Sequence, residues 1–196
     1  MKNSKTRKIA VTAMLSAVAT VLMYVQLPIG VMPAFIKLDI SEFPALIAAM
    51  ALGPWWGVAV CAIKNVLHAL MSSSGYIGEL SNFLLGVAFV LPTGLIYKAK
   101  KTKRRALVSL VVGSLVMAGV GFFTNYFIIY PLYDKFMLSI NAIIGMYSAI
   151  LPSADTLWEC LLIFNVPFTF IKGLICTALM MLIYKRISHL IKGKTE

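Results

Sequence analysis

The chain has 196 residues, of which 60% are hydrophobic and only 13% are charged. An average soluble domain carries about 25% charged residues, so this composition excludes a soluble enzyme, a disordered chain and a secreted disulfide scaffold. The long uncharged stretches match the roughly 20 apolar residues that a membrane-spanning helix needs. We therefore predict an all-α integral membrane protein that forms a single domain over residues 1–196.

The net charge of +11 comes from 18 Lys and Arg against 7 Asp and Glu. Most of the basic residues flank apolar segments, in clusters at residues 2–8, 98–105 and 185–194. Basic residues concentrate at the cytoplasmic ends of membrane spans and attract anionic lipid headgroups. The pattern predicts both termini in the cytoplasm, the lipid bilayer as surroundings and no nucleic-acid partner.

If all three clusters are cytoplasmic, an even number of spans must separate each pair. Gly53 and Pro54 divide the apolar stretch between residues 42 and 71, because this dipeptide favours a turn. The stretch 136–154 carries polar residues, so we expect an external loop with a short helix there. The result is a bundle of six transmembrane helices, expected at about residues 8–27, 42–52, 55–71, 79–97, 106–130 and 157–187.

The segment 28–41 begins with two prolines and a glycine that stop the first helix, yet it stays largely apolar. An apolar loop outside a span must be covered by something, because its exposure to water is unfavourable. One interpretation is an external lid over an outward-facing pocket, hinged at Lys37, Asp39 and Glu42. The alternative is a loop packed on the bundle, with Asp39 and Ser41 capping the next helix.

Polar residues inside the predicted spans are candidates for a functional site, since burying them in a membrane is costly. Lys64 and His68 are four residues apart and share a helix face. The structural alternative is that Lys64 forms an internal ion pair, for example with Glu79. Glu79 and Asn82 either face a polar cavity or, for Glu79, stabilise a helix N-terminus. Asn125 carries an amide suited to a neutral polar ligand.

The last predicted helix carries one polar stripe. Asn165, Thr169 and Lys172 are spaced four and three residues apart, which places them on one face. Three polar residues with one charge favour a cavity wall over simple helix packing. No acidic residue lies one turn from Lys172 on this helix, so its partner must come from another helix or from the ligand. Glu79 and Glu159 are candidate partners.

The sequence contains no motif of a hydrolase or an ATPase. The Walker A, HExxH and GxSxG patterns are all missing from it. Its three cysteines are isolated in apolar stretches, which predicts neither a disulfide nor a metal site. We therefore expect no enzyme activity, no metal and no cofactor.

A series of short motifs, in order along essentially the whole chain, resembles the substrate-binding S-components of energy-coupling-factor (ECF) vitamin transporters. Each motif is weak alone, and their order and spacing make the resemblance specific. The motifs are Ala13-xxx-Ala17, KLDISEFP at 37–44, Gly53-Pro54, Lys64-Asn65, GELSNF at 78–83, Asn125-Tyr126-Phe127, Pro131-Leu-Tyr133 and Pro167-Phe168-xxx-Lys172-Gly173.

The resemblance is greatest to riboflavin-specific members of that family. It implies a multi-pass protein of the bacterial plasma membrane that captures riboflavin from outside with high affinity. It also implies a membrane T-component, docked at Ala13 and Ala17, and two cytoplasmic ATPase subunits. The family's ligand contacts correspond to Lys37, Glu42, Asn125 and Lys172.

One position departs from the family pattern, because Thr169 stands where the family has an asparagine. Threonine keeps one donor and one acceptor but reaches less far, so this position bears on ligand identity. Lys64, Glu79, Asn82 and Thr169 complete the candidate substrate-binding set. Two alternatives stay open: an S-component for another small vitamin, and a membrane scaffold protein whose polar stripe is structural.

Overall fold

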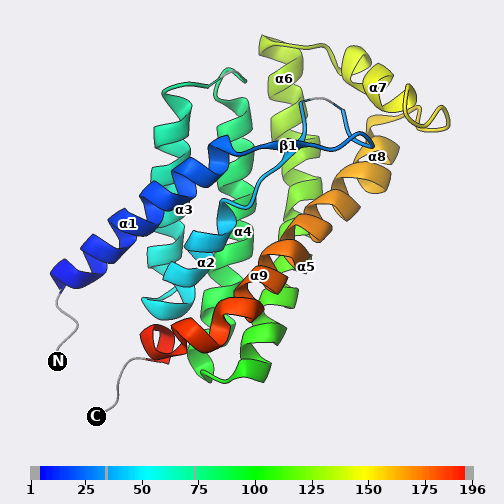
Figure 1. Cartoon of the computed structure of the whole chain (residues 1–196). Coiled ribbons are helices and arrows are strands. Elements are labelled where there is room, and N and C mark those ends of the chain that lie inside the picture. The colour runs from blue at the N-terminus through cyan, green and yellow to red at the C-terminus, as the bar shows by residue number, and fades with distance from the viewer. Residues whose placement is uncertain (1–4, 34, 73, 193–196) are drawn as a thin grey trace.

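The computed structural model describes residues 5–33, 35–72 and 74–192, and it is a bundle of helices (Figure 1). The helices are α1 (Lys5–Tyr24), α2 (Glu42–Ala51), α3 (Pro54–Ala69), α4 (Ile77–Ala99), α5 (Lys103–Thr124), α6 (Tyr130–Phe136), α7 (Ile140–Ser148), α8 (Leu157–Cys160) and α9 (Val166–Lys192), with π-helical turns η1 (Asn125–Ile129) and η2 (Leu161–Asn165). An antiparallel pair of two-residue strands, β1 (Leu27–Pro28) and β2 (Lys37–Leu38), lies between α1 and α2.

Among the described residues, four helical segments are long and apolar enough to cross a membrane: Lys5–Tyr24, Ile77–Ala99, Lys103–Phe136 and Leu157–Arg186. The helices α2 and α3 are shorter, with 10 and 16 residues. A turn at Gly53, whose φ of 123° suits only glycine, separates them, and Pro54 starts α3. The predicted division at this dipeptide is confirmed.

The fifth predicted helix is longer than expected. The sequence predicts an end near residue 130, but α5, η1 and α6 continue as one segment to Phe136. In a regular α-helix the Pro131 ring would clash with the carbonyl four residues earlier. The turn η1, in which the Tyr130 N–H donates to the Asn125 carbonyl, widens the helix at that point. The turn η2 stands in the same relation to Pro167.

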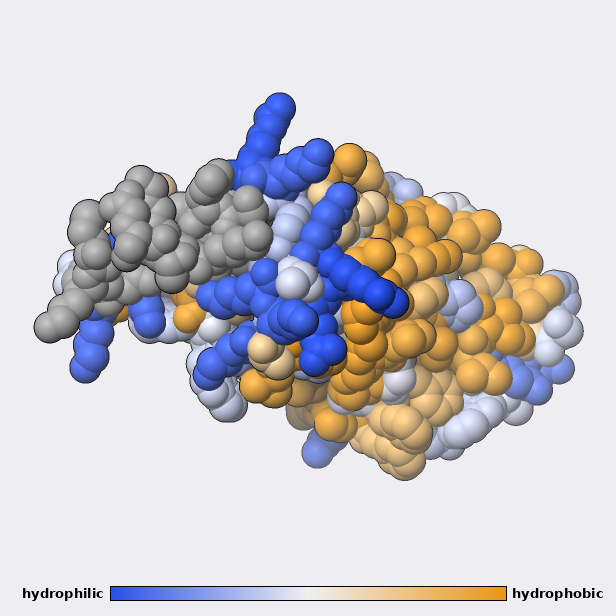
Figure 2. All heavy atoms as spheres, turned by 90° about the horizontal axis from the view of Figure 1, so that it is seen from below, coloured by the Kyte–Doolittle hydropathy of each residue, from blue (hydrophilic) through white to orange (hydrophobic). Residues whose placement is uncertain are grey.

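The basic residues gather at one end of the bundle, where α1 begins, α4 meets α5 and α9 ends (Figure 1). We refer to this end as the basic end; Lys2 and Lys194 of the predicted clusters lie outside the described residues. Figure 2, seen from this end, shows hydrophilic side chains gathered beside a broad hydrophobic flank. The strands and α7 lie toward the opposite end (Figure 1). As predicted, the stretch 136–154 contains one short helix, α7.

The short helix α2 lies inside the bundle, in contact with α1, α3, α4 and α9. Its alanines Ala45, Ala48 and Ala49 are at most 2% exposed, and their small side chains let the neighbouring helices approach closely. Gly57 of α3 is part of this packing, since a Cβ there would lie 2.3 Å from Val90 Cγ1 of α4. This packing places the first residue of α2, Glu42, in the interior.

Candidate ligand-binding site

A cavity opens toward the end of the bundle that lies away from the basic end. It is enclosed by the segment before α2, the start of α4, the region around η1 and the region around η2. The empty space between its walls, which includes open solvent at the mouth, is about 700 Å³. Polar side chains on its walls include Lys37, Asp39, Asn82, Asn125, Asn165, Thr169 and Lys172.

Five of the predicted binding residues line this cavity: Lys37, Asn82, Asn125, Thr169 and Lys172. They come from β2, α4, η1 and α9, so the fold brings together residues from distant parts of the chain. Lys37 is exposed at the cavity mouth, whereas Asn125, Thr169 and Lys172 are each 6% exposed. The polar stripe on the last helix therefore faces a cavity, as its spacing predicts.

The other three predicted residues lie elsewhere. Glu42 and Lys64 are 1% and 0% exposed and form a buried ion pair, with 2.9 Å between Glu42 Oε1 and Lys64 Nζ. Glu79 pairs with His68 at 2.8 Å and accepts hydrogen bonds from two serines of the α3–α4 loop. The predicted Lys64–Glu79 pair is wrong. Lys64 lies one turn before His68 on α3, and its side chain points toward Glu42 of α2.

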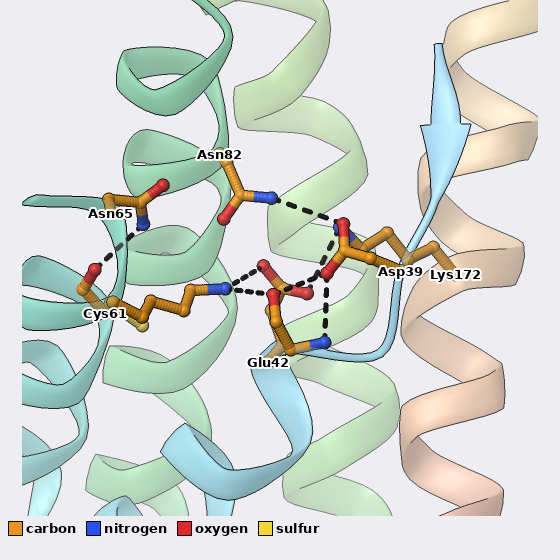
Figure 3. A network of polar contacts seen from close by, with 8 residues as sticks. Asp39, Glu42, Cys61, Asn65, Asn82 and Lys172 are labelled. Atoms are coloured by element: carbon orange, nitrogen blue, oxygen red, sulfur yellow. Dashed lines mark hydrogen bonds and ion pairs between the residues drawn. The ribbon is translucent and has the colours of Figure 1, made fainter. Parts of the chain in front are cut away.

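Four buried charged residues form one network beside the cavity (Figure 3). Lys172 Nζ lies 2.8 Å from Asp39 Oδ2 and 3.1 Å from Glu42 Oε2, and Glu42 also contacts Lys64. Two ammonium groups therefore face two carboxylates. Buried charges are costly unless each finds a partner, and here each does. The network joins the segment before α2 to α2, α3 and α9.

Ser41 and Asp39 are hydrogen-bonded to each other within this network. The Ser41 backbone N–H and hydroxyl both donate to Asp39 Oδ1, and the Ser41 hydroxyl accepts from Lys64 at 2.5 Å. Asp39 thus accepts the backbone N–H of Ser41, the residue directly before α2. The Ser41 side chain makes no capping hydrogen bond, so the predicted capping is wrong for Ser41. Burial by itself would raise the pKa of Asp39, but the nearby Lys172 and Lys64 ammonium groups outweigh it and hold that pKa well below its ordinary value.

The partner of Lys172 comes from outside its own helix, as the sequence predicts, but its identity differs from the two candidates. Asp39 and Glu42 take that role. Glu159 instead forms a capping box with Thr156 at the start of α8. Neither partner of Lys172 is near in sequence, so spacing along α9 carried no information about them.

The segment 28–41 lies against the cavity through Phe35. The centroid of the Phe35 ring lies 6.4 Å from the ring centroids of Tyr130 and Tyr147, with the rings edge-on to each other. It lies 6.0 Å from the ring centroid of Tyr133. Phe35, Tyr130 and Tyr133 all line the cavity. Sequence reasoning missed this aromatic wall, because a tyrosine in an apolar helix has the same pattern as a core residue.

The alanines predicted to dock a partner lie on the outer face of α1. Ala13 and Ala17 are exposed, next to Met14, which is 70% exposed, and Val18, which is 52% exposed. Ala19 on the other face is fully buried. Within residues 5–33, 35–72 and 74–192, no three His, Cys, Asp or Glu side chains gather closely enough to hold a metal ion.

These features define a multi-pass membrane protein with a small-molecule cavity near one end. Residues 7–184 match the family described as "ECF transporter, substrate-specific component", and the chain belongs to that family. It is therefore a transporter subunit in the membrane and not an enzyme.

Two curated relatives match almost the whole chain. It is 31% identical to the riboflavin transporter RibU of Staphylococcus aureus (strain TCH60), over 95% of this chain and 93% of that one. It is 35% identical to the riboflavin transporter FmnP of Bacillus subtilis (strain 168), over 92% and 91%. The solved structure described as "Structure and mechanism of the S component of a bacterial ECF transporter" shares the fold, with a TM-score of 0.76, 31% identity and coverage of 96% and 99%.

Proposed function

We propose that this protein is the high-affinity riboflavin-binding subunit of an ECF-type importer. The observation that carries the proposal is a mixed aromatic and polar cavity in a chain whose near full-length relatives are riboflavin transporters. An isoalloxazine ring has flat apolar faces and polar atoms at one edge. It needs an apolar cleft with a few oriented donors and acceptors, and this cavity offers both.

We assign the pyrimidine edge of the ring to Asn125, Thr169 and Lys172. The hydroxyl groups of the ribityl chain fit Lys37 and Asn82 at the other side of the cavity. Glu42 and Lys64 act from behind the wall, since they hold Lys172 and the segment before α2 in place. Asp39 replaces Glu42 as the carboxylate that faces the cavity.

The proposed topology has six transmembrane helices and both termini in the cytoplasm. Its support is that the basic clusters of the sequence lie at one end of the bundle, where Figure 2 shows hydrophilic side chains, since basic residues favour the cytoplasmic side. The cavity lies toward the other end, where it would take riboflavin from outside. The segment 28–41 then acts as the lid, with Phe35 against the aromatic wall.

Transport requires a membrane T-component and two cytoplasmic ATPase subunits, in this proposal. The T-component docks on the outer face of α1 at Ala13 and Ala17, where small side chains permit close approach of another helix. Among the described residues, none from α1 lines the cavity. Docking and ligand binding therefore use different surfaces.

The test is the colour of the protein purified in detergent without added ligand. A tightly bound flavin gives a yellow sample with flavin absorbance, and denaturation releases riboflavin that can be identified by mass. A colourless protein that also fails to take up added riboflavin contradicts the proposal. Uptake of a different vitamin by that sample would move the protein to another substrate within the same family.

A further inference from the structure

Three buried side chains from different elements close a ring of hydrogen bonds at the cavity wall. The Tyr147 hydroxyl of α7 donates to Asn165 Oδ1 at 2.5 Å, and Asn165 Nδ2 donates to the Tyr130 hydroxyl at 3.0 Å. The two hydroxyls lie 2.6 Å apart. Because Tyr147 gives its proton to Asn165, it must accept that of Tyr130. The ring thereby holds the Asn165 side chain in one plane.

The ring of hydrogen bonds uses only half of the hydrogen-bonding capacity of the Asn165 amide. A primary amide has two N–H donors and an oxygen with two lone pairs. Within the part of the chain that the structure describes, the ring takes one hydrogen and one lone pair, so one donor and one acceptor are left. Asn165 is 6% exposed and lines the cavity. A buried polar group that keeps unused capacity is costly unless a ligand or water completes it.

The position of Asn165 matches that of the proposed ligand contacts. It lies one turn before Thr169 and two before Lys172 on the stripe that faces the cavity. It also ends the π-helical turn η2, as Asn125 begins the π-helical turn η1. Such turns commonly occur at functional sites. Of the three amides that line the cavity, two thus lie at an irregular turn of a helix.

We propose that Asn165 binds the donor–acceptor edge of the flavin ring directly, and that Tyr147 of α7 is a positioning residue that orients its amide. This inference rests on the proposed function. A planar amide with one donor and one acceptor complements a ring edge that carries a carbonyl beside an N–H. The short helix α7 thereby contributes to ligand selection without itself lining the cavity.

The lid segment reaches the same ring of hydrogen bonds. Phe35 packs edge-on against Tyr130 and Tyr147, the two residues that hold the Asn165 amide. Movement of Phe35 therefore changes the packing of both phenols. In this arrangement Asn165 is fully oriented to recognise the edge of the flavin ring only when the segment 28–41 lies over the cavity.

The experiment compares the dissociation constants of riboflavin and of its analogue methylated at ring nitrogen N3, which lacks the N–H of that edge. The variants are Asn165→Leu and Tyr147→Phe, and the matched control is Tyr97→Phe. Tyr97 forms a buried hydroxyl pair with Tyr184 at 2.9 Å, on α4 and α9 and outside the cavity wall. The control removes the same kind of bond elsewhere.

We expect Asn165→Leu to weaken riboflavin binding about 10- to 100-fold, the range for losing paired hydrogen bonds in a buried site. Binding of the methylated analogue should change less than about threefold. Asn165→Leu should therefore lower the ratio of the dissociation constant of the analogue to that of riboflavin. Tyr147→Phe should lower this ratio as well, by a smaller factor. Tyr97→Phe should leave both constants unchanged.

Equal losses for the two ligands in Asn165→Leu would show a structural role and overturn the proposal, as would unchanged affinity. If Asn165→Leu does not fold, Tyr147→Phe decides by the same ratio, since it keeps the aromatic ring in place. A wild-type protein that binds neither flavin contradicts the proposed function itself. If instead the wild type binds riboflavin and the variants keep the wild-type ratio of the two dissociation constants, the role of Asn165 is contradicted and the proposed function is not.

Discussion

The ammonium group of Lys172 on α9 lies 2.8 Å from the carboxylate of Asp39, although the two residues are 133 positions apart. Both line the cavity. Asp39 follows β2 and belongs to the segment 28–41, so the last helix and the proposed lid meet at one buried charge pair. Any ligand that contacts Lys172 therefore also acts on the segment that covers it.

Replacing Lys172 by methionine should weaken riboflavin binding by about 1.5–3 kcal/mol, the value of a charged hydrogen bond. This corresponds to roughly 10- to 150-fold in the dissociation constant, measured by quenching of flavin fluorescence. Lys135→Met is the control, because Lys135 is an exposed lysine at the end of α6. Wild-type affinity in Lys172→Met would remove this residue from the site.

The Lys64–Glu42 pair should matter for stability rather than for ligand contact. Removing one member of a buried ion pair costs about 3–5 kcal/mol. Without Lys64, the single ammonium group of Lys172 would face both the Asp39 and the Glu42 carboxylates. Lys64→Met should lower the free energy of unfolding in detergent by that amount. The double variant Lys64→Met/Glu42→Gln should recover part of it, and the exposed Lys98→Met should have no effect. A fully stable Lys64→Met protein would contradict this account.

Riboflavin should protect the segment 28–41 from proteolysis added on the outer side of the membrane. The ligand would hold the lid through Phe35 and Asp39, which both line the cavity. Cleavage rates are measured with and without riboflavin, and cleavage in the α4–α5 loop of inverted vesicles serves as the reference. Equal rates in the segment 28–41 under both conditions would show a fixed loop and rule out a lid.

Bulky replacements at Ala13 and Ala17 should abolish riboflavin uptake by cells and leave binding to the purified protein intact. The reason is that α1 presents these residues outward, away from the cavity. Leu115→Trp is the matched control on another exposed helix position, since Leu115 is 56% exposed on α5. Loss of binding in the alanine variants would mean that they disturb the bundle itself.

The sequence predicted the features that depend on local pattern. Uncharged length predicted the helices, Gly53-Pro54 predicted the break between α2 and α3, and the spacing of Thr169 and Lys172 predicted a cavity wall. Each of these follows from the period of the helix or from turn chemistry. They required no knowledge of which helices are neighbours.

The features that sequence reasoning missed depend on which helices meet. The partner of Lys64 is Glu42 because α2 lies inside the bundle, and no spacing rule contains that fact. The tyrosines around Asn165 were indistinguishable from core residues until the fold brought α6, α7 and η2 together. The extension of the fifth helix past Pro131 depended on a π-helical turn, which has no recognised sequence signal here.

The most direct test of the account is a fluorescence titration of riboflavin with the purified, ligand-stripped protein. We predict quenching of the flavin with one binding site per chain. The physical reason expected for the quenching is that a bound flavin ring would pack against the aromatic side chains that line the cavity. Titration to a saturating protein concentration without quenching, and without retention of riboflavin on gel filtration, would contradict the central claim.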